Sequence, residues 1–257
     1  MSRPTLPILL GILLAGCSPQ PAPAADSAEP VPPGVVDPCT AGGDDQACAD
    51  QARAAIHAGD GKTARRLAKV GCDRGHADSC GLLGVTLADG LGGAVDMEAG
   101  LQLLRKGCAE DHAASCSDLG SILMERPVGS ASDAEAYAAL HKACGADDAR
   151  ACSNFVEPAL AGRGGPADPH RAVNAGQKAC FDLDWGPGCM NLGIVYYSGG
   201  YLKKQPDLAF KTWARGCRLG ALDACKNVLS GGTDAQRAEA RPLACALGHT
   251  EACEDGQ

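Results

Sequence analysis

The sequence predicts an all-α protein, an α/α superhelical solenoid of helix-turn-helix repeats about 36 residues long with one disulfide per repeat. Two observations predict this fold: 14 of the 15 cysteines fall into seven closely spaced pairs, and the pairs recur at a nearly constant interval. Self-similarity at a period of roughly 20 to 50 residues is typical of solenoids, in which each unit packs against its neighbours. The pairs are Cys39 with Cys48, Cys72 with Cys80, Cys108 with Cys116, Cys144 with Cys152, Cys180 with Cys189, Cys217 with Cys225, and Cys245 with Cys253.

Residues 1–16 have the features of a lipoprotein signal peptide. Arg3 precedes a short apolar run at 8–14, whereas a membrane-spanning helix needs roughly 18 apolar residues. The sequence Leu-Ala-Gly-Cys that ends at Cys17 resembles the lipobox of bacterial lipoproteins, in which the cysteine is acylated and becomes the N-terminus. Because Cys17 also lies outside the seven pairs, we expect it to be lipidated and to anchor the chain in a lipid membrane. An ordinary signal peptide with a chance cysteine is the alternative.

The remaining chain divides into a Pro/Ala-rich tether, residues 17–38, and a cysteine-rich repeat domain, residues 39–257. Lipidation at Cys17 predicts a location in the cell envelope, and Ser18 after it favours the outer membrane or the periplasmic face. Fourteen paired cysteines in an exported chain favour disulfides over thiols. The net charge is −8 at pH 7 and the basic residues are not clustered, so no nucleic acid partner is expected.

The cysteine spacing also predicts where the chain reverses direction. Two cysteines eight residues apart on one helix would be separated by about 12 Å, and a disulfide requires Cα atoms within about 7 Å. Each pair therefore connects the end of one helix to the start of the next. In six of the seven pairs, the third residue after the first cysteine is Gly or Asp, which tolerate left-handed backbone. The fifth pair departs from this pattern, because Leu183 occupies the position. The suited residues are Gly42, Gly75, Asp111, Asp147, Gly220 and Gly248.

Within one repeat, the sequence predicts a helix at about 77–88, a glycine-containing loop, and a second helix at about 96–108 that begins at Asp96. Asp168 followed by Pro169 repeats this start signal. Pro158 predicts a kinked or shortened helix in a later repeat. A large apolar residue followed by glycine recurs at one position of the first helix, which indicates close helix packing. These glycines are Gly84, Gly120 and Gly193.

The combined pattern resembles the cysteine-rich branch of the Sel-1-like repeats, which are related to tetratricopeptide repeats. The best match is Cys-Met-Asn-Leu-Gly-Ile-Val-Tyr-Tyr-Ser-Gly-Gly at 189–200, followed by Trp-Ala-Arg-Gly-Cys at 213–217. The solenoid surface, together with the absence of a recognisable catalytic set, predicts a membrane-anchored, non-catalytic scaffold or adaptor that binds an envelope protein or peptide on a concave repeat surface. The resemblance implies an alternative, because some cysteine-rich members are described as penicillin-binding proteins or weak β-lactamases.

The sequence contains no recognisable catalytic set for that alternative. Ser-x-x-Lys, Ser-Asp-Asn and Lys-Thr-Gly are all absent, as is a His-x-His-x-Asp cluster. Three cysteine loops contain a histidine, at His76, His112 and His249, but each loop offers only three ligands without the Cys-x2-Cys spacing of structural zinc sites. We therefore expect no metal and no cofactor. A cysteine-based redox protein is a third reading, which the regular repetition of the pairs disfavours.

Aromatic residues concentrate in the best-matching repeat. Tyr196 and Trp213 are expected in the core, whereas Trp185, Tyr197 and Tyr201 are the candidates for an exposed partner-binding patch. Aromatic side chains supply much of the binding energy at protein interfaces. The alternative is that these three side chains pack loops locally.

Overall fold

The computed structural model describes residues 39, 44–199 and 202–254, so the predictions for Cys17, the tether and Gly42 lie outside the described residues. The described part contains thirteen α-helices, one π-helical segment and no strand. None of its helices is long and apolar enough to cross a bilayer. The helices are α1 (Asp45–His57), α2 (Gly61–Asp73), α3 (Ala77–Ala88), α4 (Met97–Ala109), α5 (Ala113–Met124), α6 (Asp133–Gly145), α7 (Ala149–Ala161), α8 (Pro169–Gln177), α9 (Gly186–Ser198), α10 (Pro206–Arg218), α11 (Leu222–Gly231), α12 (Asp234–Ala246) and α13 (Thr250–Glu254).

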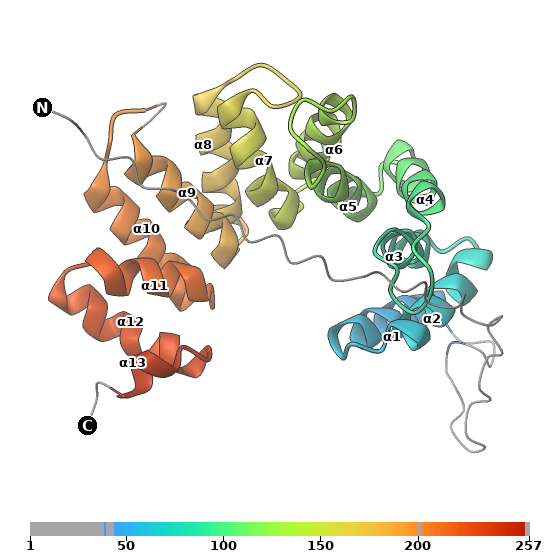
Figure 1. The fold of residues 1–257 in the computed structure, drawn as a ribbon, viewed down its shortest axis with the longest axis horizontal. Coiled ribbons are helices and arrows are strands. Elements are labelled where there is room, and N and C mark those ends of the chain that lie inside the picture. Colours follow the sequence, from blue (N-terminus) through green and yellow to red (C-terminus); the bar gives the residue numbers. More distant parts are fainter. Residues whose placement is uncertain (1–38, 40–43, 200–201, 255–257) are drawn as a thin grey trace, which may run out of the picture. The chain divides into compact units, whose positions relative to one another are not determined.

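The helices form consecutive helix-turn-helix repeats, as the sequence predicts. Each helix packs against the next one along the chain (Figure 1). The odd-numbered helices, here called A helices, also contact the next A helix from α1 through α11. Helices α3 and α4 agree with the predicted ranges to within a residue, and the Asp96 carboxylate accepts the Ala99 N–H at 3.1 Å. Asp168 caps α8 in the same way, at 2.9 Å from the Arg171 nitrogen.

All seven predicted cysteine pairs are bonded in the structure. Their Cα–Cα distances are 4.4 to 5.0 Å, well inside the limit that a disulfide requires. A covalent bond therefore closes every predicted reversal of the chain. The bonds join Cys39 to Cys48, Cys72 to Cys80, Cys108 to Cys116, Cys144 to Cys152, Cys180 to Cys189, Cys217 to Cys225, and Cys245 to Cys253.

The backbone at these reversals follows the predicted column with one exception. The exception is the fifth pair, where the left-handed residue is Asp184 and not Leu183. One additional residue separates Cys180 from Cys189, and the chain accommodates it in a π-helical segment, Lys178–Asp182. Left-handed backbone occurs at the predicted column at Gly75, Asp111, Asp147, Gly220 and Gly248.

A cation from the following repeat binds each aspartate in the left-handed conformation. Lys178 donates to the Cys144 carbonyl at 2.7 Å and pairs with Asp147 at 2.6 Å. Lys142 makes the same two contacts one repeat earlier, with Cys108 and Asp111. Arg215 repeats them with Cys180 and Asp184. Each cation lies two residues before the first cysteine of its own pair, so neighbouring reversals are linked.

We expect replacement of Asp147 to separate the backbone effect from the ion pair. Asp147→Ala places a Cβ-bearing residue with no local hydrogen bond at φ 64° and should lower the free energy of unfolding by about 1 kcal/mol. Asp147→Gly relieves the backbone and loses only an exposed ion pair, so its change should stay within about 0.5 kcal/mol. Urea unfolding checks this. Equal destabilisation by both substitutions would contradict the backbone assignment.

The core is built from small residues facing large ones across each A helix and the following helix. A Cβ placed on Gly84 would lie 2.9 Å from Leu104 Cγ, and one on Gly120 would lie 2.5 Å from Leu140 Cγ. Gly193 faces the Trp213 ring in the same way. Tyr196 and Trp213 are both 5 % exposed, which confirms their predicted core positions.

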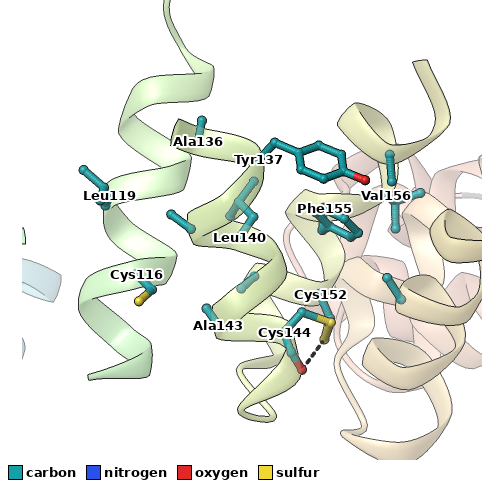
Figure 2. Close-up of a cluster of buried hydrophobic side chains, with 14 of the residues drawn as sticks. Cys116, Leu119, Ala136, Tyr137, Leu140, Ala143, Cys144, Cys152, Phe155 and Val156 are labelled. Atoms are coloured by element: carbon teal, nitrogen blue, oxygen red, sulfur yellow. Dashed lines mark hydrogen bonds between the residues drawn. A yellow bond between two sulfur atoms is a disulfide. The ribbon is translucent and has the colours of Figure 1, made fainter. Parts of the chain in front are cut away.

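In the repeat between those of Gly120 and Gly193, the large residue is on the A helix and the glycine is on the following helix. Its A helix carries the buried Val156, and the glycine is on the next helix at Gly176, where a Cβ would lie 3.5 Å from Val156 Cγ2. Figure 2 shows Val156 and Phe155 on α7 beside Leu140 on α6. The predicted shortening at Pro158 does not occur, since α7 keeps 13 residues and Pro158 lies in its penultimate turn.

Candidate functional site

A cavity of about 520 Å³ opens on the A helices α5, α7 and α9, and we call it the A-helix groove. Residues from the C-terminal half of each helix line it, including Met124 on α5, Leu160 on α7 and Ile194 on α9. Val156 and Val195 are nearly completely buried at 3 % and 4 % exposure, whereas Ile194 is 46 % exposed. The groove therefore combines a buried apolar base with an exposed apolar side chain.

A hydrogen-bond network fixes the orientation of the two amide side chains that line the groove. Ser121 Oγ donates to the Ser117 carbonyl at 2.8 Å, so it must accept from Asn154 Nδ2 at 2.9 Å. Asn191 Nδ2 donates to the carbonyl and the hydroxyl of Ser153 at 3.1 and 3.0 Å. Asn191 therefore uses both of its N–H groups and Asn154 uses one of its two, and neither amide oxygen accepts a hydrogen bond within the described residues.

The unpaired charge in the groove is negative. Glu125 and Glu157 are exposed and have no hydrogen bond or ion pair within the described residues. Arg163 also lines the groove, but its guanidinium contacts Asp133 at 2.9 Å and the carbonyls of Met124 and Arg126 at 2.8 and 2.6 Å. This arginine is engaged by the protein and is not available to bind an anion.

The ion pair between Arg163 and Asp133 is expected to make the free energy of unfolding depend on pH. Hydrogen bonds from Arg163 lower the pKa of Asp133 below its usual value of 3.8, helped by the Gly129 amide. Because the folded-state pKa is the lower one, the stabilisation is present above about pH 4 and is lost as pH falls through the folded-state pKa.

We expect Asp133→Asn to be less stable than the unsubstituted protein near pH 6 and to approach it near pH 2. The readout is the urea midpoint of both proteins across this range. A stability difference that does not change with pH would contradict the assigned role of Asp133.

The two described aromatic candidates, Trp185 and Tyr197, do not lie together. Trp185 precedes α9 and Tyr197 lies in its last turn, so about 18 Å of helix separates them. Tyr197 is 42 % exposed, contacts the Phe210 and Trp213 rings, and has Lys204 over its face at 4.8 Å. Tyr201 lies outside the described residues. Tyr197 follows Ile194 by three residues and is therefore on the same side of α9.

The histidines of the cysteine loops are positioned at helix starts. His112 Nδ1 accepts the Ser115 N–H at 3.3 Å, and His249 Nδ1 accepts the Ala252 N–H at 3.2 Å. His112 Nε2 additionally contacts Asp78 of the preceding repeat at 2.6 Å. Among the residues that the structure describes, no three His, Cys, Asp or Glu side chains form a metal-binding group.

Comparison with known proteins gives a consistent answer at the level of fold. No family model and no curated protein sequence matches the chain. Among solved structures, a Sel1 repeat protein from Oxalobacter formigenes superposes with a TM-score of 0.62 at 17% identity, over 80% of this chain and 88% of that one. The chain has the Sel1-like repeat fold. The fold predicted from the cysteine and glycine pattern is thereby confirmed.

Two further solved structures superpose with slightly lower TM-scores. A protective antigen of uropathogenic Escherichia coli matches with a TM-score of 0.57 at 15% identity, and the alignment covers 81% of this chain but only 47% of the antigen. An immunity protein from Pseudomonas aeruginosa matches with a TM-score of 0.56 at 16% identity, over 82% of this chain and 83% of that one. At these identities the likeness concerns the fold alone.

Proposed function

We propose that this protein is a non-catalytic scaffold or adaptor that binds a protein or peptide partner in the A-helix groove. The observation that carries the proposal is the groove itself, with exposed Ile194 beside a buried apolar base and free acceptors at Asn154 and Asn191. Binding sites in proteins combine apolar surface with a few fixed polar groups in this way. The helices that present these side chains are held in register by the disulfides.

We further propose that the protein acts in the cell envelope, anchored through acylated Cys17. Two features support this location: the lipobox-like sequence before Cys17, and seven disulfides, which persist in oxidising compartments. The Pro/Ala-rich tether of residues 17–38 would then connect the lipid to the repeat domain and leave the groove accessible to other envelope proteins.

The experiment that tests the binding function is chemical crosslinking of the anchored protein in its native envelope, followed by identification of what co-purifies. A protein that carries only the tether is the background control. Ile194→Glu introduces a charge into the groove. Val95→Glu is the matched control, because Val95 is 64 % exposed in the loop between α3 and α4 and does not line the groove.

We expect one protein to be enriched by the unsubstituted chain and by Val95→Glu, and to be lost with Ile194→Glu. A partner that is retained by Ile194→Glu would show that binding occurs elsewhere on the repeat domain. No enrichment over the tether control would contradict the scaffold function.

A further inference from the structure

We propose that the A-helix groove selects a positively charged peptide segment of about six extended residues in which basic and apolar side chains alternate. This inference rests on the proposed function and adds the chemistry of the partner. Three features carry it: the groove presents two unbonded amide oxygens, its unpaired charges are both negative, and its apolar side chains come from three helices in a row.

The first feature follows from the amide network. Both N–H groups of Asn191 and one of the two of Asn154 are bonded to Ser153 and Ser121, and both amide oxygens are unbonded, so each amide offers its oxygen to a ligand. Pro158 has no N–H, so the Asn154 carbonyl also lacks its usual helical partner four residues on. A ligand bound here must therefore supply the donors, and the strongest peptide donors are the side chains of Lys and Arg.

The second feature is electrostatic. Glu125 and Glu157 lie on neighbouring A helices and lack a cationic partner within the described residues. The C-terminal turns of α5 and α7 line the groove, and the C-terminal end of a helix carries partial negative charge. Arg163 offsets none of this, because Asp133 and two carbonyls already bind it. A cationic ligand is favoured and an anionic one is repelled.

The third feature distinguishes a peptide from a small polyamine. Met124, Leu160 and Ile194 each come from a different A helix. Neighbouring helices pack about 8 to 10 Å apart, so these side chains extend over on the order of 20 Å. An extended peptide covers that distance with about six residues at roughly 3.3 Å per residue. Its alternate side chains can contact the apolar residues while the others reach the carboxylates, whereas a polyamine offers only the methylene groups of a thin chain and no side chains to fill the space between Met124, Leu160 and Ile194.

The test measures binding of the oxidised repeat domain to three pools of acetylated, amidated nine-residue peptides. Alternate positions are drawn from Leu, Ile, Met and Phe in every pool. The intervening positions are Lys or Arg in the first pool, Gln in the second and Glu in the third. The double variant Glu125→Gln with Glu157→Gln removes the groove carboxylates, and Glu110→Gln with Glu251→Gln removes two exposed carboxylates elsewhere, so both variants have the same net charge.

We expect the basic pool to bind at least tenfold more tightly than the Gln pool, and the Glu pool not to bind. The groove variant should weaken binding of the basic pool about tenfold, and the control variant should leave it within about twofold. Equal binding of the basic and Gln pools, or equal loss in both variants, would overturn the charge selection while the groove could still bind a neutral partner. Absence of binding by every pool would also overturn it, and envelope crosslinking would then decide the binding function separately.

Discussion

Reduction of the seven disulfides is expected to unfold the repeat domain. Each bond closes a loop of eight or nine residues, which corresponds to about 2.5 kcal/mol of stabilisation in the chain-entropy model. Seven such bonds together exceed about 10 kcal/mol, and a typical domain has a net stability of about 5 to 15 kcal/mol. Much of the core is alanine and cysteine, so few large apolar side chains are available to compensate.

The measurement is circular dichroism at 222 nm with and without a phosphine reductant, with free thiols counted in parallel. We expect most of the helical signal to disappear once the paired cysteines are reduced. The matched control combines Cys144→Ala with Cys152→Ala, which removes one bond and should lower the free energy of unfolding by about 2.5 kcal/mol without unfolding the domain. A fully reduced chain that keeps its helical signal and melting temperature would contradict this account of stability.

Phe155→Ala is expected to be the most destabilising single substitution in the core. Phe155 is 1 % exposed and packs edge-on against Tyr137 at a ring distance of 4.8 Å. The His141 ring lies 5.3 Å away on the same helix as Tyr137, and Figure 2 shows Tyr137 and Phe155 side by side. Truncation of a buried phenylalanine removes apolar contact and leaves a cavity, which costs about 3 to 5 kcal/mol.

Urea unfolding of the oxidised protein measures this effect. The control is Val128→Ala, a truncation at a side chain that is 78 % exposed, which should change the free energy of unfolding by less than about 0.5 kcal/mol. A loss below about 1 kcal/mol at Phe155 would show that α6 and α7 are not held together by this aromatic contact.

The features that the sequence predicted correctly are determined by residues close together in the chain. The reversals follow from cysteines eight residues apart, and the helix starts at Asp96 and Asp168 follow from local capping chemistry. The displacement of the left-handed residue to Asp184 could not be read in the same way, because a π-helical segment accommodates the extra residue there. Column alignment assumes a constant helix geometry, so it identified the fifth pair as a departure, with Leu183 in the column, but did not locate the left-handed residue there.

The candidate site was less predictable, because it depends on contacts between repeats. Along the chain, Glu157 follows Glu125 by 32 residues and Ile194 follows Glu157 by 37 residues. These groove residues come together only when the A helices stack. Aromatic clustering in sequence pointed instead to Trp185 and Tyr197, which lie at opposite ends of α9. One available signal was the polar residue two positions after the second cysteine of a pair, which is asparagine in three successive repeats, at 154, 191 and 227.

The exchange of Val156 and Gly176 also depends on packing between neighbours. Either order of small and large residue satisfies the helix contact, so the first helix of a repeat does not reveal which order its partner requires. A comparison of second helices would show glycine where the neighbouring repeats have leucine or tryptophan. The packing of Val156 against Gly176 is therefore specified by both helices together and cannot be predicted from one aligned sequence position.

The most direct test of the A-helix groove as a binding surface is site-specific photocrosslinking in the native envelope. A benzophenone side chain placed at Ile194 reports contacts within the groove, and the same group at Val95 reports an exposed loop elsewhere. The groove hypothesis predicts a discrete crosslinked partner from Ile194 that is absent from Val95. Equal crosslinking from both positions, or a partner captured only from Val95, would contradict it.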